Sequence, residues 1–568
     1  MSIKNAFRYL RHPEAATASM ISDFKKKFGT RDLIVWMFFL IYLFIGSQIF
    51  DDYGVSMDEP IQRKHGIVSF EYVNNQLGHV FPVKHVYNQD IQYYDHRDYG
   101  VIFQMVAYFT ELSLGLSNSR DVFLLRHLMV FILFWISTIF FFRTIEYHLD
   151  DWKLALLGTL FLILSPRIFA NSFYNPKDIP LLSWCIISTY TMFKYLDSKK
   201  IKYIILHAFA CAMAVNTRIV AIYIPAITIG FVMLDWLKKK KRLEVLKSYL
   251  TSSMLFILFF VAFTIFLWPF LWSDPIHHFL YSFTSMSHFR WRNSIFFMGD
   301  FVYPDNLPWY YIPGWIAIST PILYLVTFLL GVWFVIITTL RNRLALYSNK
   351  YERNNLVFLC LFLLPLLAVI ILKSTLYNGW RHLYFVYPPL IVISIIGLKA
   401  VSDAILNKIS NKNWLIVSKG VITCILLFCM SKVVYDIVTM HPHQNVYFNE
   451  IAERNASDNF DLDYYGLSFK QGLEKLINNS DEEKINVAYS NFCGMNNWYI
   501  LPEDLKNRIR ETNIDSAEFF ITNYHLNAQS TEKIMEKKYP YNQQLIDSIK
   551  VKNNVIIGIY RLGRNSDR

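Results

Sequence analysis

The sequence predicts a polytopic α-helical membrane protein with a small α/β domain at its C-terminal end. Of its 568 residues 54% are hydrophobic, and the mean hydropathy of +0.26 exceeds what a soluble domain of this size normally carries. Long apolar runs rich in Leu, Ile and Phe recur between residues 33 and 436. A helix needs about 20 apolar residues to cross a hydrocarbon core, and these runs do not alternate as the strands of a barrel do. They therefore predict membrane-spanning helices.

The apolar runs predict eleven crossings. The spans are expected at residues 33–50, 121–142, 154–170, 180–196, 203–217, 219–237, 246–268, 313–338, 355–373, 383–401 and 414–436. Lysine and arginine gather in the loops after even-numbered spans, so the positive-inside rule places those loops and the N-terminal segment 1–32 in the cytoplasm. The run 203–217 is short and contains His207. If it formed a re-entrant pair with its neighbour, the sidedness of the other loops would not change.

The net charge of +12 follows from this topology and does not indicate a nucleic-acid partner, because the basic residues cluster in short loops between apolar runs. Five of the six cysteines lie inside apolar runs, which leaves Cys493 alone in the polar part and gives no disulfide framework. No small-residue cleavage site follows the first span, so we expect an uncleaved anchor. The sequence has no Walker loop and no strand-linked GxGxxG pattern, so nucleotide chemistry has no support.

Two long loops, 51–120 and 269–312, follow odd-numbered spans and are expected outside the cytoplasm. In the first loop, Pro60–Gln76 and Gly100–Leu116 have spacing compatible with helices on the membrane surface, which predicts a structured cap. The second loop is crowded with Trp, Tyr and Phe, which favour the lipid–water interface. We expect this loop to form a lid.

The composition separates a transmembrane domain at 33–436 from a polar domain at 437–568, which is expected outside the membrane on the same side as the two long loops. Short apolar runs in the polar domain predict strands, and the stretches between them predict helices. The predicted strands are Ile485–Ser490, Ala517–Thr522 and Val555–Leu562, and the predicted helices are 468–478 and 531–538.

An acidic pair follows the first span in the segment Ser56-Met57-Asp58-Glu59-Pro60. Adjacent carboxylates suit general-base chemistry, because one can accept a proton while its neighbour or a cation tunes its pKa. The same residue types also begin helices, with Asp58 or Ser56 as the cap and Pro60 in the first turn. Both interpretations remain open, and they do not exclude each other.

A second polar segment, Asn175-Pro176-Lys177-Asp178, lies between the third and fourth spans on the same side. The Lys177 ammonium can bind a phosphate while Asp178 orients it. The alternative is an interfacial turn, because Asn-Pro favours a turn and a lysine at a membrane edge extends to the headgroups.

A third segment runs from Tyr377 to Tyr384 and contains Arg381 and His382 among aromatic residues. Arg381 and His382 can clamp a phosphate, and Tyr377 can help to shape a sugar site. An aromatic belt with an anchoring arginine explains the composition equally well.

Further cations are expected on the same side as these segments. They are Arg218, Arg290 and Arg292. The pair His277-His278 and the group His96-Arg97-Asp98 have neither the helical spacing nor the cysteines of a strong metal site. A divalent metal therefore has no support, and the sequence indicates no certain cofactor. The three polar segments fall on one side of the membrane when sidedness is assigned from lysines alone, which favours a shared site.

With these motifs the sequence resembles the bacterial polyprenyl-phosphate-sugar-dependent glycosyltransferases of superfamily C, near the protein O-mannosyltransferases and the aminoarabinose transferase of lipid A. The resemblance rests on Asp58-Glu59, Asn175–Asp178 and the stretch Leu376–Leu390. It extends to HPHQNVYFNE at His441–Glu450 and to DLDYYGLSFKQGLEKL at Asp461–Leu476. The tail lacks the lumenal repeats of the eukaryotic protein O-mannosyltransferases.

The resemblance implies a GT-C fold in the cytoplasmic membrane of a bacterium and inverting transfer of one sugar from a polyprenyl-phosphate donor at the outer face. It implies Asp58 as the general base, with Glu59 supporting the site. The phosphate candidates Lys177 and Arg381 rest on their chemistry and position. The acceptor can be a protein hydroxyl, a lipid or a cell-wall glycan.

Two other functions remain as alternatives. A transporter or flippase for lipid-linked glycans predicts charges in mid-helix and broken spans in repeated halves, and neither is evident in the sequence. A non-catalytic envelope assembly protein would use the C-terminal domain to bind a partner, but such an anchor needs far fewer spans.

Overall fold

The computed structural model describes residues 29–82, 86–87, 89–239, 243–287, 291, 293–525 and 544–562. The chain divides into two compact units, residues 1–49 and 50–568. The described part of the first unit is the single helix α3 (Thr30–Ile49), an apolar helix of 20 residues. Among the described residues, the second unit holds the other helices and the strands.

The chain is mostly helical, as predicted. In its described part, eight helical segments are long and apolar enough to cross a membrane, or nine spans if one bent pair of helices counts as a single crossing. The eight are α3, α6 (Ser119–Leu149), α11 (Tyr223–Lys238) with the short helix η2 (Ile219–Ile222), α12 (Leu243–Leu267), α15 (Ile322–Arg341), α16 (Lys350–Ile371), α17 (Tyr387–Leu406) with η5 (Arg381–Val386), and α18 (Lys412–Thr439). The count of eleven predicted from the sequence is not confirmed.

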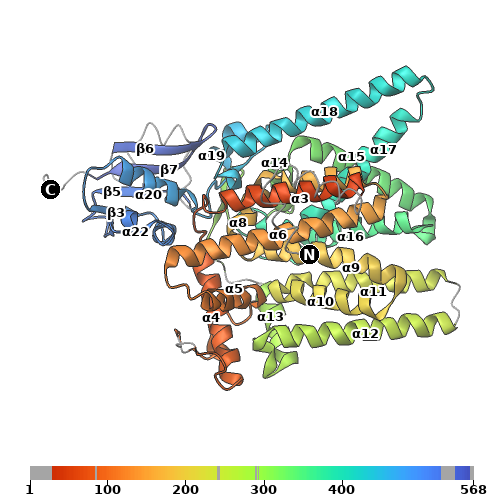
Figure 1. The fold of residues 1–568 in the computed structure, drawn as a ribbon, viewed down its shortest axis with the longest axis horizontal. Coiled ribbons are helices and arrows are strands. Elements are labelled where there is room, and N and C mark those ends of the chain that lie inside the picture. The colour runs from red at the N-terminus through yellow and green to blue at the C-terminus, as the bar shows by residue number, and fades with distance from the viewer. Residues whose placement is uncertain are drawn as a thin grey trace, which may run out of the picture. The chain divides into compact units, whose positions relative to one another are not determined.

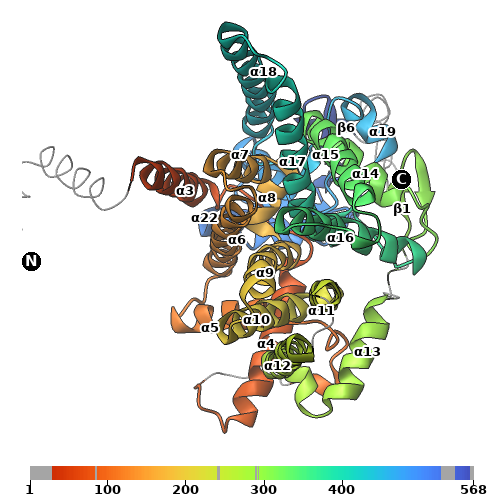
Figure 2. The same cartoon turned by 90° about the vertical axis from the view of Figure 1, so that its right-hand side faces the viewer.

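Two predicted spans are helices that fall outside these eight. The run 180–196 lies in α9 (Asp178–Ser198), and the run 203–217 forms α10 (Ile201–Thr217), which is a shorter apolar helix. Most residues of α9 are buried among other helices, so α9 does not need the hydropathy of a lipid-facing span. Figure 2 shows α9, α10, α11 and α12 side by side and nearly end-on.

Two other predicted spans are interrupted at a proline. The run 154–170 is the bent pair α7 (Trp152–Ile163) and α8 (Pro166–Tyr174), whose axes differ by 68°. The run 313–338 is two helices, α14 (Tyr311–Ser319) and α15, separated at Thr320-Pro321. Ser165 and Thr320 precede prolines and have extended backbones, as the steric clash with the proline ring demands. Both predicted runs are therefore helical but broken at a proline, and α15 alone is long and apolar enough to count as a candidate span.

Helices α15 and α17 approach closely through two glycines. A Cβ atom on Gly331 would lie 2.0 Å from the carbonyl oxygen of Ile393, and one on Gly397 would lie 2.0 Å from that of Thr327. The hydroxyl groups of Thr327 and Ser394 also hydrogen-bond across this contact. The contact fixes α17, whose preceding turn η5 begins at Arg381.

Loop 51–120 forms helices in the two segments where the sequence predicts them. Helix α4 (Glu59–Gln76) and helix α5 (Ile102–Ser113) occupy the two segments with helical spacing in loop 51–120. Loop 269–312 contains η3 (Pro269–Trp272), α13 (Pro275–Ser287) and the hairpin of β1 (Ile295–Phe297) and β2 (Asp300–Val302). Arg290 and Arg292 lie outside the described residues, and the role of this loop as a lid stays a prediction.

The C-terminal part contains a five-stranded sheet in the order β4-β3-β5-β7-β6, visible beside α20 in Figure 1. The strands are β3 (Ile485–Tyr489), β4 (Ile509–Glu511), β5 (Phe519–Thr522), β6 (Gln544–Val551) and β7 (Asn554–Arg561). Strand β3 is parallel to β4 and β5, whereas β7 is antiparallel to β5 and β6. Helix α20 (Ser468–Asn478) packs on the sheet through Gly472, which faces Ile557.

The three predicted strands correspond to β3, β5 and β7, and the predicted helix 468–478 corresponds to α20. Strands β4 and β6 were not predicted, because β4 is only three residues long and β6 (QLIDSIKV) does not alternate strictly between apolar and polar residues. The predicted helix 531–538 lies outside the described residues. Helices α21 (Cys493–Trp498) and α22 (Glu503–Lys506) connect β3 to β4.

Candidate active site

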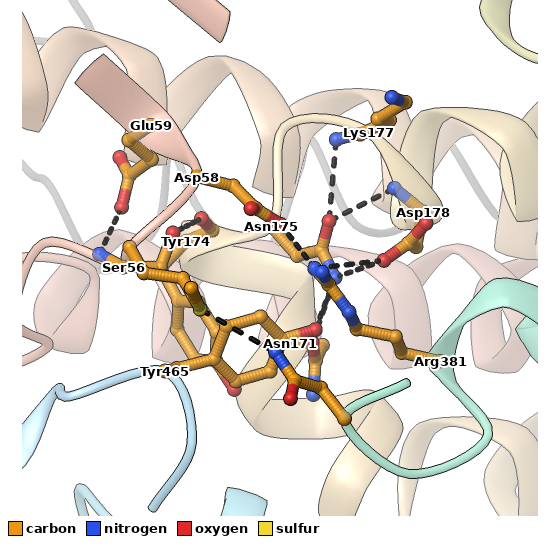
Figure 3. Close-up of polar contacts among 12 residues, drawn as sticks. Ser56, Asp58, Glu59, Asn171, Tyr174, Asn175, Lys177, Asp178, Arg381 and Tyr465 are labelled. Atoms are coloured by element: carbon orange, nitrogen blue, oxygen red, sulfur yellow. Dashed lines mark hydrogen bonds and ion pairs between the residues drawn. The ribbon is translucent and has the colours of Figure 1, made fainter. Parts of the chain in front are cut away.

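Asp58 stands at the N-cap position of α4 but makes no side-chain cap hydrogen bond. Its carboxylate accepts a hydrogen bond from Nη1 of Arg381 and forms an ion pair with it (Figure 3). The Asp58 side chain keeps 19% of its surface exposed, whereas Arg381 keeps 2%. Asp58 is therefore the accessible member of the pair, and its carboxylate is directed at a cation instead of the helix amides.

Arg381 also lies beside a second carboxylate. Its Nη1 is 3.8 Å from Oδ2 of Asp178, and Nη2 of Arg218 is 2.7 Å from Oδ1 of the same residue. The structure thus brings together residues from four distant segments: Asp58, Asp178, Arg218 and Arg381. Asp178 begins α9 and Arg381 begins η5, which leads into α17, whereas Arg218 directly follows the C-terminal end of α10. The N-terminal ends of two helical segments therefore meet the C-terminal end of a third.

The Asn175–Asp178 turn is held by its own asparagine. Oδ1 of Asn175 accepts the backbone amides of Lys177 and Asp178, at 3.2 and 2.8 Å. Nδ2 of Asn175 donates to Oδ2 of Asp178 at 3.0 Å. Gln104 of α5 donates to the carbonyl oxygen of Pro176 at 2.8 Å. The segment is therefore a turn, and this turn also brings Asp178 beside the cations.

Lys177 is 6% exposed, and its ammonium lies 3.2 Å from the ring centroid of Tyr99. In Figure 3 its side chain extends away from Arg381. Burial, with the nearby charge of Arg218, lowers the pKa of Lys177 well below its usual range, although Asp58 and Asp178 oppose the shift. An anion placed beside this ammonium would favour its charged form.

The pKa of Asp58 is lowered from its usual value. Burial alone would raise the pKa of this carboxyl, but the charge of Arg381 and its hydrogen bond outweigh burial, and Lys177 and Arg218 add to their effect. Asp58 is consequently ionised at neutral pH, which is the protonation state that a general base requires.

Tyr377 and His382 form an aromatic wall beside Arg381. The Tyr377 ring lies 5.3 Å from the Arg381 guanidinium, is stacked on Trp291 at 4.3 Å, and meets the edge of His382 at 4.6 Å. Burial, partly offset by Arg381, raises the pKa of Tyr377 to about 12, so its phenol keeps its proton. His382 is thus placed to support Tyr377.

Glu59 points away from the cations (Figure 3). Its Oε1 accepts the backbone amide of Ser56 at 2.7 Å, and its Oε2 lies 3.0 Å from Nε2 of His127. The side chain is 1% exposed. Glu59 therefore braces the turn that presents Asp58, in agreement with the supporting role that the resemblance implies and not with a direct part in proton transfer.

The sequence did not single out two residues that complete the site. The Tyr465 hydroxyl accepts a hydrogen bond from Nδ2 of Asn175 at 2.8 Å, and its ring lies 5.4 Å from the Arg381 guanidinium. Asn497 accepts the amide of Val55 and donates to the carbonyl oxygens of Val55 and Gly466. The stretch DLDYYGLSFKQGLEKL contains Tyr465 and was a signal, but nothing in the sequence indicated Asn497.

Metal ligands do not gather near this site in the described ranges, where no group of three or more His, Cys, Asp and Glu residues could hold an ion. His96 and Asp98 lie in loop 51–120, and His277 and His278 lie in α13.

Comparison with known proteins supports the resemblance. Residues 104–268 match the model of the dolichyl-phosphate-mannose-protein mannosyltransferase family, a segment that includes Lys177, Asp178 and Arg218. No curated protein matches the chain significantly in sequence.

Solved structures were also compared. The chain is similar to ArnT from Cupriavidus metallidurans bound to undecaprenyl phosphate, with a TM-score of 0.48, 10% identity and coverage of 94% of this chain and 98% of that one. It is similar to the archaeal oligosaccharyltransferase AglB from Archaeoglobus fulgidus in complex with an inhibitory peptide and a dolichol-phosphate, with a TM-score of 0.45, 10% identity and coverage of 86% and 69%. With TM-scores below 0.5, neither likeness decides the fold or the function.

The family match confirms the resemblance that the sequence predicted. The chain is a multi-pass membrane glycosyltransferase, similar over residues 104–268 to the dolichyl-phosphate-mannose-protein mannosyltransferases.

Proposed function

We propose that this chain is an inverting glycosyltransferase that moves one sugar from a polyprenyl-phosphate donor to an acceptor hydroxyl at the outer face of the bacterial cytoplasmic membrane. The observation that carries the proposal is the ion pair of Asp58 with the buried Arg381, beside Asp178 and Arg218. An ionised base and a cluster of cations are the two elements that this reaction requires.

In the proposed reaction the acceptor oxygen attacks the anomeric carbon while the bond from that carbon to the phosphate oxygen breaks. The phosphate leaves with the bonding electron pair, and Asp58 takes the proton of the acceptor hydroxyl. The leaving group gains negative charge as it departs, and fixed guanidinium groups stabilise that charge without reorganising. The ion pairs of Arg381 with Asp58 and of Arg218 with Asp178 support this role for the two arginines.

Arg381 is proposed to interact with both the base Asp58 and the phosphate of the donor. Before the donor binds, its guanidinium neutralises Asp58. A phosphate that binds Arg381 competes for the same N–H groups and weakens their bond to Asp58. The pKa of Asp58 then rises from its lowered value, because burial is no longer offset, and the carboxylate becomes a stronger base. Donor binding thereby prepares the base.

The proposed orientation puts the N-terminal segment 1–32 in the cytoplasm, and the site and the domain 437–568 outside it. The N-terminal ends of α9 and of η5 meet the C-terminal end of α10 at the site, which supports one shared face. The domain limits and the eleven crossings predicted from the sequence stand as parts of this proposal.

Purified protein with a labelled polyprenyl-phosphate sugar and an envelope extract tests the function. We expect sugar transfer with stoichiometric release of polyprenyl phosphate. A flippase would move the donor across a vesicle membrane with its sugar still attached. An assembly protein would neither transfer the sugar nor move the donor across the membrane. Mass spectrometry of envelope glycans with and without the gene then identifies the acceptor as a protein, a lipid or a cell-wall glycan.

A further inference from the structure

A cavity lies near the C-terminal end of α9, at the opposite end of this helix from the candidate active site. Helix α9 runs from Asp178 at the site to Ser198, and its 21 residues correspond to about 30 Å, the thickness of a hydrocarbon core. The chain then turns at Lys199 and returns as α10, which ends beside Arg218. The loop between these helices therefore belongs to the other membrane interface.

The cavity has a volume of about 450 Å³ and opens to the surface between the start of α10 and the first turns of α12. Its lining combines two lysines, three hydroxyl residues and three aliphatic residues: Lys199, Lys247, Ser248, Thr251, Ser252, Ile201, Ile204 and Leu255. None of the eight residues is acidic. The cavity is thus cationic, hydrogen-bonding on one wall and apolar on another.

Among the described side chains, the neighbouring carboxylate of Asp197 does not neutralise the charge of the cavity. Asp197 is held by Arg353 and Lys350, each at 2.6 Å. The Lys199 ammonium is fixed 3.0 Å from the carbonyl oxygen of Leu196 and 4.1 Å from the Tyr249 ring centroid. Helix α10 also begins here without a side-chain cap, so its positive end faces this region.

The apolar wall continues onto an exposed apolar surface. On α12, Leu250, Met254 and Leu258 are each more than half exposed, and Ile201 of α10 is 51% exposed. A free sugar phosphate or nucleotide has no hydrocarbon chain that could pack on this apolar surface. A molecule with an anionic head and hydrocarbon tails matches both parts.

We propose that this cavity binds the headgroup of an anionic phospholipid. The phosphate lies between the ammonium groups of Lys199 and Lys247, and headgroup hydroxyls bond to Ser248 and Thr251. The acyl chains follow Leu255 onto the exposed face of α12. The site is separate from the glycosyl-transfer site and does not depend on the proposed chemistry there.

Native mass spectrometry of the detergent-solubilised protein tests the proposal. We expect dioleoyl-phosphatidylglycerol to bind the wild type more tightly than dioleoyl-phosphatidylcholine does. The double variant Lys199→Ala/Lys247→Ala should bind phosphatidylglycerol about 30-fold more weakly, because each ammonium near an anionic headgroup contributes a factor of about 5. Glycerol 1-phosphate should compete poorly, since it lacks the acyl chains.

The matched control is Lys200→Ala/Lys202→Ala, which removes two exposed lysines from the same end of α10 but outside the cavity lining. It should keep phosphatidylglycerol binding within about threefold of the wild type. Equal binding of the two lipids, or an equal loss in both double variants, would overturn the proposal. Competition by glycerol 1-phosphate at the affinity of the lipid would assign the cavity to a soluble phosphate instead. If the double variant does not fold, Lys247→Gln on the exposed face of α12 tests the same contact.

Discussion

A single guanidinium organises the candidate active site. Arg381 reaches Asp58 and Asp178, while Arg218 takes the other oxygen of Asp178. A buried cation without an acidic partner is costly, and two carboxylates near each other repel. Because Arg381 lies between Asp58 and Asp178, and Arg218 pairs with Asp178, each charge has a neighbour of opposite sign. Asp58 is the more accessible of the two acids.

Asp58→Asn removes the base and keeps the shape of the side chain. We expect the protein to fold and transfer to fall about 10²- to 10⁴-fold, the usual contribution of a positioned base. Rates with a labelled donor measure this loss, and Asp51→Asn in the same loop is the control that should retain activity. Transfer by Asp58→Asn near the wild-type rate would exclude Asp58 as the base.

Arg381→Gln should change the pH dependence of the residual transfer. Arg381 lowers the pKa of Asp58, so the wild-type base loses its ionised form only in strong acid, below the usual carboxyl range. Without Arg381, burial raises the pKa of Asp58, and activity is lost as pH falls through a higher value. The acid limb of kcat/KM against pH should therefore move upward.

Arg218→Gln is the matched control for this shift, because it leaves the contact between Asp58 and Arg381 in place. Its acid limb should move less. An acid limb that stays fixed in Arg381→Gln would show that the titrating group is not Asp58.

At the scale of elements, the sheet of the C-terminal part holds a segment of the active site. Ligands of open α/β sheets bind outside the carboxyl ends of parallel strands. Here that place is filled by the chain: Asn523 after β5 donates to the carbonyl oxygen of Asp463 at 2.8 Å. Two residues further along, the carbonyl oxygen of Tyr465 accepts the amide of Met57 at 3.0 Å. The sheet thereby positions the turn that carries Asp58.

Asn497→Ala tests this connection between elements. The change leaves the buried carbonyl oxygens of Val55 and Gly466 without their donor and should cost about 1–3 kcal/mol of stability. Thermal unfolding in detergent measures the loss, and transfer should fall with it. Asn479→Ala removes an exposed amide from the end of α20 and should change neither quantity. Equal effects of the two variants would contradict a positioning role for the C-terminal part.

The sequence predicted the charged residues of the site because each stands next to an apolar run, where a charge is costly without a purpose. It did not predict Asn497 or the partner of Tyr465, since amides and phenols are ordinary in a polar domain. The contact of Tyr465 with Asn175 depends on packing between segments 290 residues apart. The sequence predicted Asp58 as an N-cap residue, but it did not predict the ion pair between its carboxylate and Arg381.

The same limit applies to the helices. Hydropathy located the apolar runs but not the breaks at Pro166 and Pro321, because a proline can also kink a continuous helix. The sequence also predicted a span at 180–196 within α9, and most residues of α9 are buried by other helices. Which run faces lipid depends on its neighbours, and a single run does not contain that information.

At the scale of the whole molecule, the proposed orientation follows from α9, which separates Asp178 from Lys199 by about 30 Å. Asp504 follows the sheet strand β3 in the C-terminal part, and Lys200 lies in the loop at the other end of α9; both are exposed. In a background without the six native cysteines, we expect a membrane-impermeant maleimide to label Asp504→Cys in spheroplasts. Lys200→Cys should react only in inverted vesicles. The positive-inside rule requires this pattern, because Lys200 and Lys202 belong to a basic loop. The reverse pattern would place the site in the cytoplasm, and labelling of both cysteines from one side would show that α9 does not cross the membrane.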